Sequence, residues 1–230
     1  MTGREFQSLI RRHLLHRMPG YSVSRNLLFR APLRYLLCGY CFESSSDPRG
    51  FYVSEFVQPL FVPDEGVTLS LGRRLGSKAG MGGTYWQLDD TNEADGMGQV
   101  LAHIRRDGTA ILRKFETLED FAKNAITRHT NPYSPYPPEM VAYGAILIGD
   151  TNRACKMFNR LEDTLRTAKH HRDYHDEILA RARRVRSAFE RDPTEAIAIL
   201  NRWRDETAAN LKLTKFLESL PTASSPKGQS

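Results

Sequence analysis

The sequence contains no run of about 18 apolar residues, the length that a membrane-spanning helix requires. Its N-terminal segment, MTGREFQSLIRRH, carries charges inside its apolar pattern, which argues against a secretory signal peptide. Cysteine is scarce, with 3 residues in 230, and an odd number of cysteines is typical of a reducing compartment. These absences predict a cytoplasmic protein that does not enter a membrane.

Local motifs of the common enzyme classes are absent too. The chain has no GxSxG nucleophile elbow, no GxGxxG that opens a helix after a strand, and no kinase, nuclease or zinc-finger pattern. Cys38 and Cys41 form a CxxC pair inside a strand-like apolar stretch, where a spacing of three directs the two side chains to opposite faces. We therefore predict two buried, inert thiols and no cofactor.

The net charge of +6 is spread along the chain rather than gathered in one segment. A dedicated nucleic-acid-binding protein usually concentrates its basic residues on one face. The composition thus leaves anionic partners, nucleic acid among them, as an open alternative.

Residues 1–130 are predicted to form an α+β domain with a mainly antiparallel sheet and flanking helices. Thr2 and Glu5 have the spacing of a capping box and begin an amphipathic helix that ends near Met18. Strands are predicted over residues 21–29 and 33–42. The second is apolar on both faces, which favours a central position in the sheet.

The most apolar strand signal, residues 51–62, organises this half of the chain. A polar turn at residues 63–66 follows, and then residues 67–71 alternate as a half-buried strand does. Together these segments predict a hairpin in which Val62 faces Val67.

The same hairpin predicts an internal ion pair. Without a bulge Glu55 falls opposite Arg74, whereas a slip of one residue would offer Arg73 instead. The loop that follows is rich in glycine and basic residues but does not match the P-loop pattern. We treat Arg73, Arg74 and Lys78 as candidates for binding an anion or a partner, and Glu55 with Arg74 as the buried ion pair.

Two further clusters could carry chemistry. Asp89 and Asp90 belong to an acidic stretch that could hold a hard cation, and with Glu55 and the arginine pair they form the best catalytic hypothesis. His171 and His175 stand at i and i+4 and could chelate a metal if one helix contains both. Because both histidines also continue an apolar stripe, capping and packing is the first interpretation, and no metal is predicted.

The second half of the chain is predicted to be helical. Residues 131–138, NPYSPYPP, contain four prolines and predict a linker that excludes helix and central strand. Residues 139–220 then show helical periodicity, which predicts an α-helical bundle or helical-hairpin domain with a strong N-cap at Asp192. The tail, residues 221–230, is predicted to be disordered.

Three segments resemble a family of bacterial proteins of unknown function: FYVSEFVQPLFVPDEGVTLSLGRRLG, IRRDGTAILRKFETLEDFAK and DPTEAIAILNRWRDETAANLKL. Residues 57–60 and the arginine pair carry most of the resemblance. Proteins of that family have a mixed α/β body, and they resemble proteins encoded in gene neighbourhoods for toxin immunity and defence. The resemblance implies a binding or neutralising role and brings no catalytic residues.

The leading hypothesis is therefore a non-enzymatic protein-interaction protein of a bacterial immunity or defence system. Its helical half would present the binding surface, including Arg202 and Arg204 as exposed contacts, to a protein partner such as the product of an adjacent gene. Two alternatives stay open. One is a nucleic-acid or nucleotide-binding accessory protein that uses the Gly/Arg loop, and the other is an enzyme whose catalytic groups are distant in sequence.

Overall fold

The computed structural model describes residues 1–76, 82–89, 91–108, 112–128, 134–168 and 172–220. Its strands form one antiparallel sheet in the order β1–β2–β3–β4–β5, and β6 pairs with the start of β4. The strands are β1 (Tyr21–Ser24), β2 (Leu27–Arg30), β3 (Leu36–Ser44), β4 (Gly50–Pro59), β5 (Arg73–Arg74) and β6 (Trp86–Gln87). The long central pair is β3 and β4, in register from Leu36↔Pro59 to Ser44↔Phe51.

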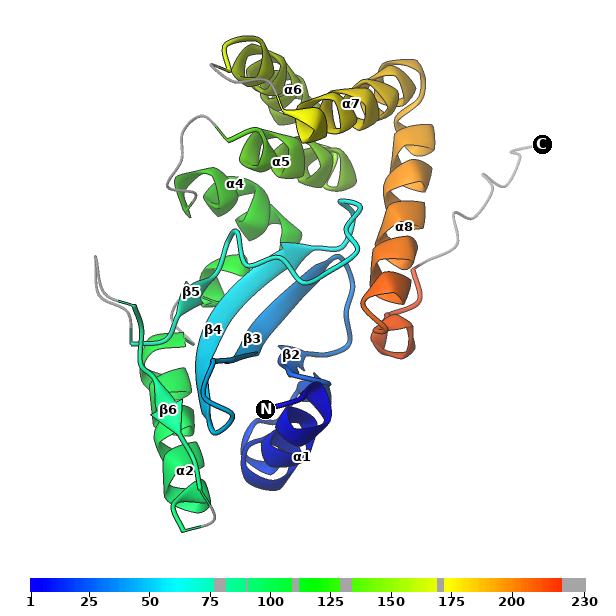
Figure 1. Cartoon of the computed structure of the whole chain (residues 1–230). Coiled ribbons are helices and arrows are strands. Elements are labelled where there is room, and N and C mark those ends of the chain that lie inside the picture. Colours follow the sequence, from blue (N-terminus) through cyan, green and yellow to red (C-terminus); the bar gives the residue numbers. More distant parts are fainter. Residues whose placement is uncertain (77–81, 90, 109–111, 129–133, 169–171, 221–230) are drawn as a thin grey trace, which may run out of the picture.

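The helices lie at both ends of this sheet and along one side (Figure 1). α1 and α2 lie at one end, α4 to α7 are stacked at the other, and α8 runs back beside the strands. This arrangement confirms the predicted α+β class. The α-helices are α1 (Gly3–His13), α2 (Glu93–His103), α4 (Leu118–Arg128), α5 (Tyr136–Leu147), α6 (Thr151–Arg166), α7 (Asp173–Arg191) and α8 (Pro193–Asn210).

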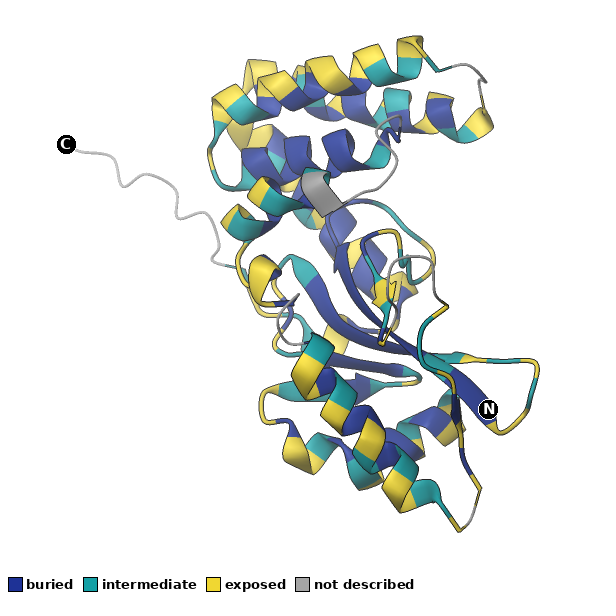
Figure 2. Ribbon diagram, turned by 90° about the vertical axis from the view of Figure 1, so that its left-hand side faces the viewer, coloured by how far each residue is buried: buried dark blue, intermediate teal, exposed yellow. Residues whose placement is uncertain are grey.

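Both faces of the sheet are buried, as the dark strands of Figure 2 show. Alternate residues of a strand point to opposite faces. One set, which includes Tyr40 and Val53, belongs to the large core shared with the helices, and the other set, which includes Phe29 and Phe56, belongs to a smaller cluster. The predicted burial of the cysteines on opposite faces is confirmed, because Cys38 lies in the large core, Cys41 lies in the smaller cluster, and both are buried free thiols.

The end of the described chain closes the smaller cluster. Leu33 N–H donates to the Phe216 carbonyl at 2.8 Å, and Glu218 N–H donates to the Leu33 carbonyl at 2.8 Å. Arg204 of α8 is buried and donates to the Glu218 carbonyl at 2.5 Å. The expectation that Arg204 is an exposed contact is therefore wrong, because this side chain holds the C-terminal segment in place.

The predicted hairpin after β4 is also wrong. β4 ends at Pro59, which has no N–H to donate, and residues 60–72, all of them described, contain no strand. The side chain of Gln58 fastens this loop instead: its Nε2 donates to the Gly66 carbonyl at 3.0 Å, and its Oε1 accepts from Thr68 N–H at 3.1 Å. Val62 and Val67 are therefore not paired in a strand ladder.

Residues 21–29 form two strands rather than the single strand predicted. Arg25, with φ 53°, takes the left-handed conformation between β1 and β2, which pair antiparallel. A residue in this conformation reverses the chain in a tight turn. The capping box at Thr2 and Glu5 is confirmed, with Glu5 N–H donating to Thr2 Oγ1 at 3.3 Å.

Helix α5 begins at Tyr136, inside the segment predicted as a linker. Pro137 and Pro138 occupy its first turn, where a missing N–H removes no helical hydrogen bond, so these prolines start the helix rather than exclude it. Helices α6, α7 and α8 confirm the helical second half, and Asp192 caps α8 as predicted.

The division into two domains stays a prediction. The large core includes side chains from both sides of the proline-rich segment, and hydrogen bonds cross between the two sides, such as Tyr35 Oη to Asn201 Oδ1 at 3.0 Å and Thr207 Oγ1 to the Val62 carbonyl at 3.2 Å. The predicted tail, residues 221–230, lies outside the described residues. Within the described part of the chain, none of the helices is both long and apolar enough to cross a membrane.

Candidate functional site

β5 places the arginine pair beside two carboxylates. Glu55 is opposite Arg73 in the ladder, and Arg73 Nε donates to Glu55 Oε1 at 3.2 Å. Arg74 Nη2 lies 3.3 Å from Glu43 Oε2, and its guanidinium stands 4.0 Å from the ring centroid of Tyr52. The predicted pair of Glu55 with Arg74 is thus wrong by one residue, because neighbouring residues of β5 face opposite sides of the sheet.

The other sequence candidates do not converge on this pair in the described structure. Lys78, Asp90 and His171 lie outside the described residues. Asp89 accepts hydrogen bonds from Thr91 and Asn92, so its carboxylate serves its own loop. These bonds, led by the one from the Thr91 hydroxyl, lower the pKa of Asp89.

His175 is buried at the start of α7 and packs edge-on against the ring of Tyr174, 4.5 Å between centroids. The packing part of the first interpretation fits this placement, and α7 has no side-chain cap hydrogen bond at its N-cap residue, Arg172. Among the residues that the structure describes, no three His, Cys, Asp or Glu side chains come close enough to hold a metal ion.

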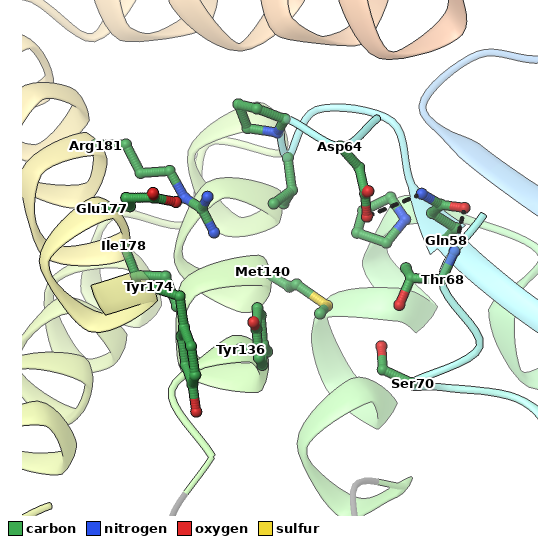
Figure 3. Close-up of a pocket in the computed structure, with 13 residues that line it drawn as sticks. Gln58, Asp64, Thr68, Ser70, Tyr136, Met140, Tyr174, Glu177, Ile178 and Arg181 are labelled. Carbon is green, nitrogen blue, oxygen red and sulfur yellow. Dashed lines mark hydrogen bonds between the residues drawn. The ribbon is translucent and has the colours of Figure 1, made fainter. Parts of the chain in front are cut away.

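A concave site lies elsewhere, between the end of β4 with its following loop, helix α5 and helix α7 (Figure 3). Its volume is about 310 Å³. We call this site the groove. It is lined by Gln58, Pro59, Val62, Pro63, Asp64, Thr68, Ser70, Tyr136, Met140, Tyr174, Glu177, Ile178 and Arg181.

Two stacked tyrosines form one wall of the groove. Tyr136 is the first residue of α5 and Tyr174 the second of α7, so the starts of two helices bring the rings together. Their centroids are 5.8 Å apart and their planes differ by 16°. Met140, one turn along α5, lies beside Tyr136 in the groove (Figure 3).

An ion pair joins the two helices behind this wall. Arg181 of α7 donates from Nε to Oε1 of Glu139 and from Nη2 to Oε2 at 2.7 Å, and the Tyr143 hydroxyl donates to Oε1 at 3.1 Å. Glu139 is 0% exposed. Burial raises the pKa of Glu139, and the hydrogen bonds and charge of Arg181 oppose that rise. Burial lowers the pKa of Arg181, but its bonds to Glu139 outweigh this and raise the pKa overall.

Asp64 stands on the loop side of the groove. Its Oδ1 accepts from Gly66 N–H at 3.1 Å, and its Oδ2 lies 3.4 Å from Gln58 Nε2 (Figure 3). Glu177 stands on the α7 side and is exposed. Within the described structure neither carboxylate has an ion-pair partner, so the groove is acidic at its rim.

The sequence patterns did not single out these residues. Tyr136 falls in the proline-rich segment predicted as a linker, and Tyr174 lies in the segment predicted only to be helical, without a motif of its own. Asp64, in a predicted turn, is far along the chain from both. Only the packing of α7 across α5 brings these positions together, and no local sequence signal indicates it.

No protein-family model, curated protein or solved structure matches the chain.

Proposed function

We propose that the chain is a non-enzymatic protein-interaction protein of the bacterial immunity or defence type, and that the groove binds a segment of its protein partner. The stacked pair of Tyr136 and Tyr174 carries this proposal. Tyrosine offers a large, rigid contact area with a hydrogen-bonding tip. Tyrosine, methionine and arginine are enriched in protein interfaces, and tyrosine and arginine also at their energetic centres.

The polar groups of the groove support binding rather than bond-making chemistry. Its arginine, Arg181, is held by the buried Glu139, and Gln58 is held by the loop backbone. No histidine, cysteine or lysine belongs to the described lining. The immunity or defence assignment draws its support from the sequence resemblance alone.

The nucleic-acid alternative relied on the Gly/Arg loop. Arg73 and Arg74 each have a carboxylate partner, and a guanidinium that is already neutralised attracts a phosphate less strongly. The arginine pair therefore gives this alternative no separate support.

The test is to coexpress the full chain with the product of each adjacent gene and to measure any complex by calorimetry. Tyr174→Ala should weaken the complex at least about tenfold, as truncation of an interface anchor does. Tyr85→Ala is the matched control, because Tyr85 is 41% exposed and lies near Gly50, at the opposite end of β4 from the groove. Absence of any complex, or equal affinity for wild type and Tyr174→Ala, would contradict the proposal.

A further inference from the structure

We infer that the groove accepts a basic side chain, arginine or lysine, so that the partner presents a cationic segment to it. This inference rests on the proposed function and adds the chemistry of the partner. It follows from the charges of the groove, from the orientation of its tyrosines and from the way its acids are held.

The charge balance of the groove is negative. Its described lining has two acids, Asp64 and Glu177, and one cation, Arg181. Arg181 is already in a two-bond ion pair with Glu139 behind the lining. Three carboxylates against one guanidinium leave two negative charges, although the whole chain has a net charge of +6. A cation is thus the group whose charge complements this site.

The aromatic wall suits a cation as well. A guanidinium or ammonium within about 6 Å of an aromatic centroid is attracted to the ring face, and a guanidinium also stacks on it. Tyr136 and Tyr174 lie on the same side of the groove, with Glu177 and Arg181 further along α7 and Asp64 across from them (Figure 3). Asp64 and Tyr136 line the same groove, so a cation bound there can contact both.

Asp64 is oriented before any partner arrives. The Gly66 N–H and the Gln58 amide each bond to one of its oxygens, and a carboxylate oxygen has further acceptor sites. Gln58 itself is fixed by the backbone of Gly66 and Thr68. A preorganised acceptor loses less side-chain entropy when it binds a charged donor.

The direct test uses blocked amino acids with the full chain. N-acetyl-arginine amide and N-acetyl-lysine amide should shift tyrosine ring signals in NMR titrations and reach saturation. N-acetyl-citrulline amide has nearly the same shape without the charge, and it should bind about tenfold more weakly. Equal binding of citrulline and arginine, or no saturable shift with either cation, would overturn the inference.

Variants locate the binding. Asp64→Asn and Glu177→Gln should each weaken the arginine probe about three- to tenfold, and added salt should reduce the wild-type affinity. Glu206→Gln is the matched control, because Glu206 is an exposed acid of α8 outside the groove. If Glu206→Gln weakens the probe as much as the groove variants do, attraction to the whole surface explains the binding and the inference fails.

The two proposals can fail separately. If a partner protein binds in a Tyr174-dependent way but neither cationic probe does, the interaction function stands and the basic side chain is excluded. If the probes bind through Asp64 and Glu177 but no partner depends on Tyr174, the cation site stands and the interaction function falls.

Discussion

Arg181 on α7 makes two hydrogen bonds to Glu139 on α5, whose carboxylate is completely buried. This pair fixes α7 against α5, and the same packing brings Tyr174 to Tyr136. The geometry of the groove therefore depends on an ion pair that contributes only one of its two members to the groove lining.

Removal of Arg181 should destabilise the protein strongly. Arg181→Ala leaves Glu139 buried without its cation, and breaking a buried pair in this way costs about 3–5 kcal/mol. Urea unfolding followed by circular dichroism measures the loss. Arg166→Ala is the control, because Arg166 pairs with Asp163 on the surface and its side chain is 78% exposed, and it should change stability little. If the two variants lose the same free energy of unfolding, the buried pair stabilises the protein no more than the surface pair does.

The loss in Arg181→Ala should also shrink as the pH falls. Burial already raises the pKa of Glu139 above its ordinary value, and loss of the cation should raise it further. An acid whose pKa is raised in the folded state favours folding below its unfolded pKa and opposes it as the pH rises through the folded pKa. Unfolding at pH 5 and at pH 8 should thus give a smaller difference from wild type at pH 5.

The register of β5 can be tested with the arginine pair. Arg73→Ala removes a guanidinium from the fully buried Glu55 and should cost about 1–3 kcal/mol. Arg74 faces Glu43, which is 24% exposed and can be solvated by water. Arg74→Ala should therefore lower the free energy of unfolding less than Arg73→Ala does, despite the contact of Arg74 with Tyr52. A larger loss for Arg74→Ala in urea unfolding would favour the register in which Glu55 meets Arg74.

The cysteines should differ sharply in reactivity. Burial raises the pKa of Cys38 and that of Cys41 to about 12, so almost no thiolate forms at pH 8. Cys155 is exposed. Ellman's reagent at pH 8 should modify one thiol per folded chain, none in Cys155→Ser, and all the cysteines in denaturant. Rapid modification of more than one thiol in the folded protein would contradict the burial of the CxxC pair.

Gly39 should not tolerate a side chain. A Cβ at this position of β3 would lie 2.2 Å from the Leu28 carbonyl oxygen of β2, and this backbone atom cannot move without disturbing the ladder. We expect Gly39→Ala to cost about 3 kcal/mol. In Gly98→Ala, the control in helix α2, the new Cβ would meet no atom within 4 Å, and the substitution should gain up to about 1 kcal/mol. Equal effects of the two substitutions would contradict the tight approach of β2 and β3.

Local patterns were sufficient for much of the fold and for little of the site. The capping box at Thr2, the N-cap at Asp192 and the alternation around Cys38 and Cys41 are properties of neighbouring residues, and all are present. The prediction of a hairpin after β4 was wrong because the side chain of Gln58 makes the hydrogen bonds that a backbone ladder would have made. Hydrophobic periodicity does not reveal such side-chain bonds.

The groove needed information that no short segment contains. Asp64, Tyr136 and Arg181 come from three elements, and their proximity follows from how α7 crosses α5 and how the loop folds back on β4. The prediction that the proline-rich segment excludes helix was also wrong. Proline stops a helix in its interior but is well tolerated in the first turn, where Pro137 lies.

The smaller cluster on the sheet has a consequence for synthesis of the protein. Its strand residues, such as Phe29 and Phe56, are made early, whereas Leu211, Leu213 and the segment that pairs with Leu33, which help to cover them, are made much later. Part of this face of the sheet therefore stays uncovered while the ribosome adds about 150 further residues, a delay of roughly 10–30 s at ordinary elongation rates. Throughout that interval the growing chain exposes an apolar surface of the kind that chaperones bind.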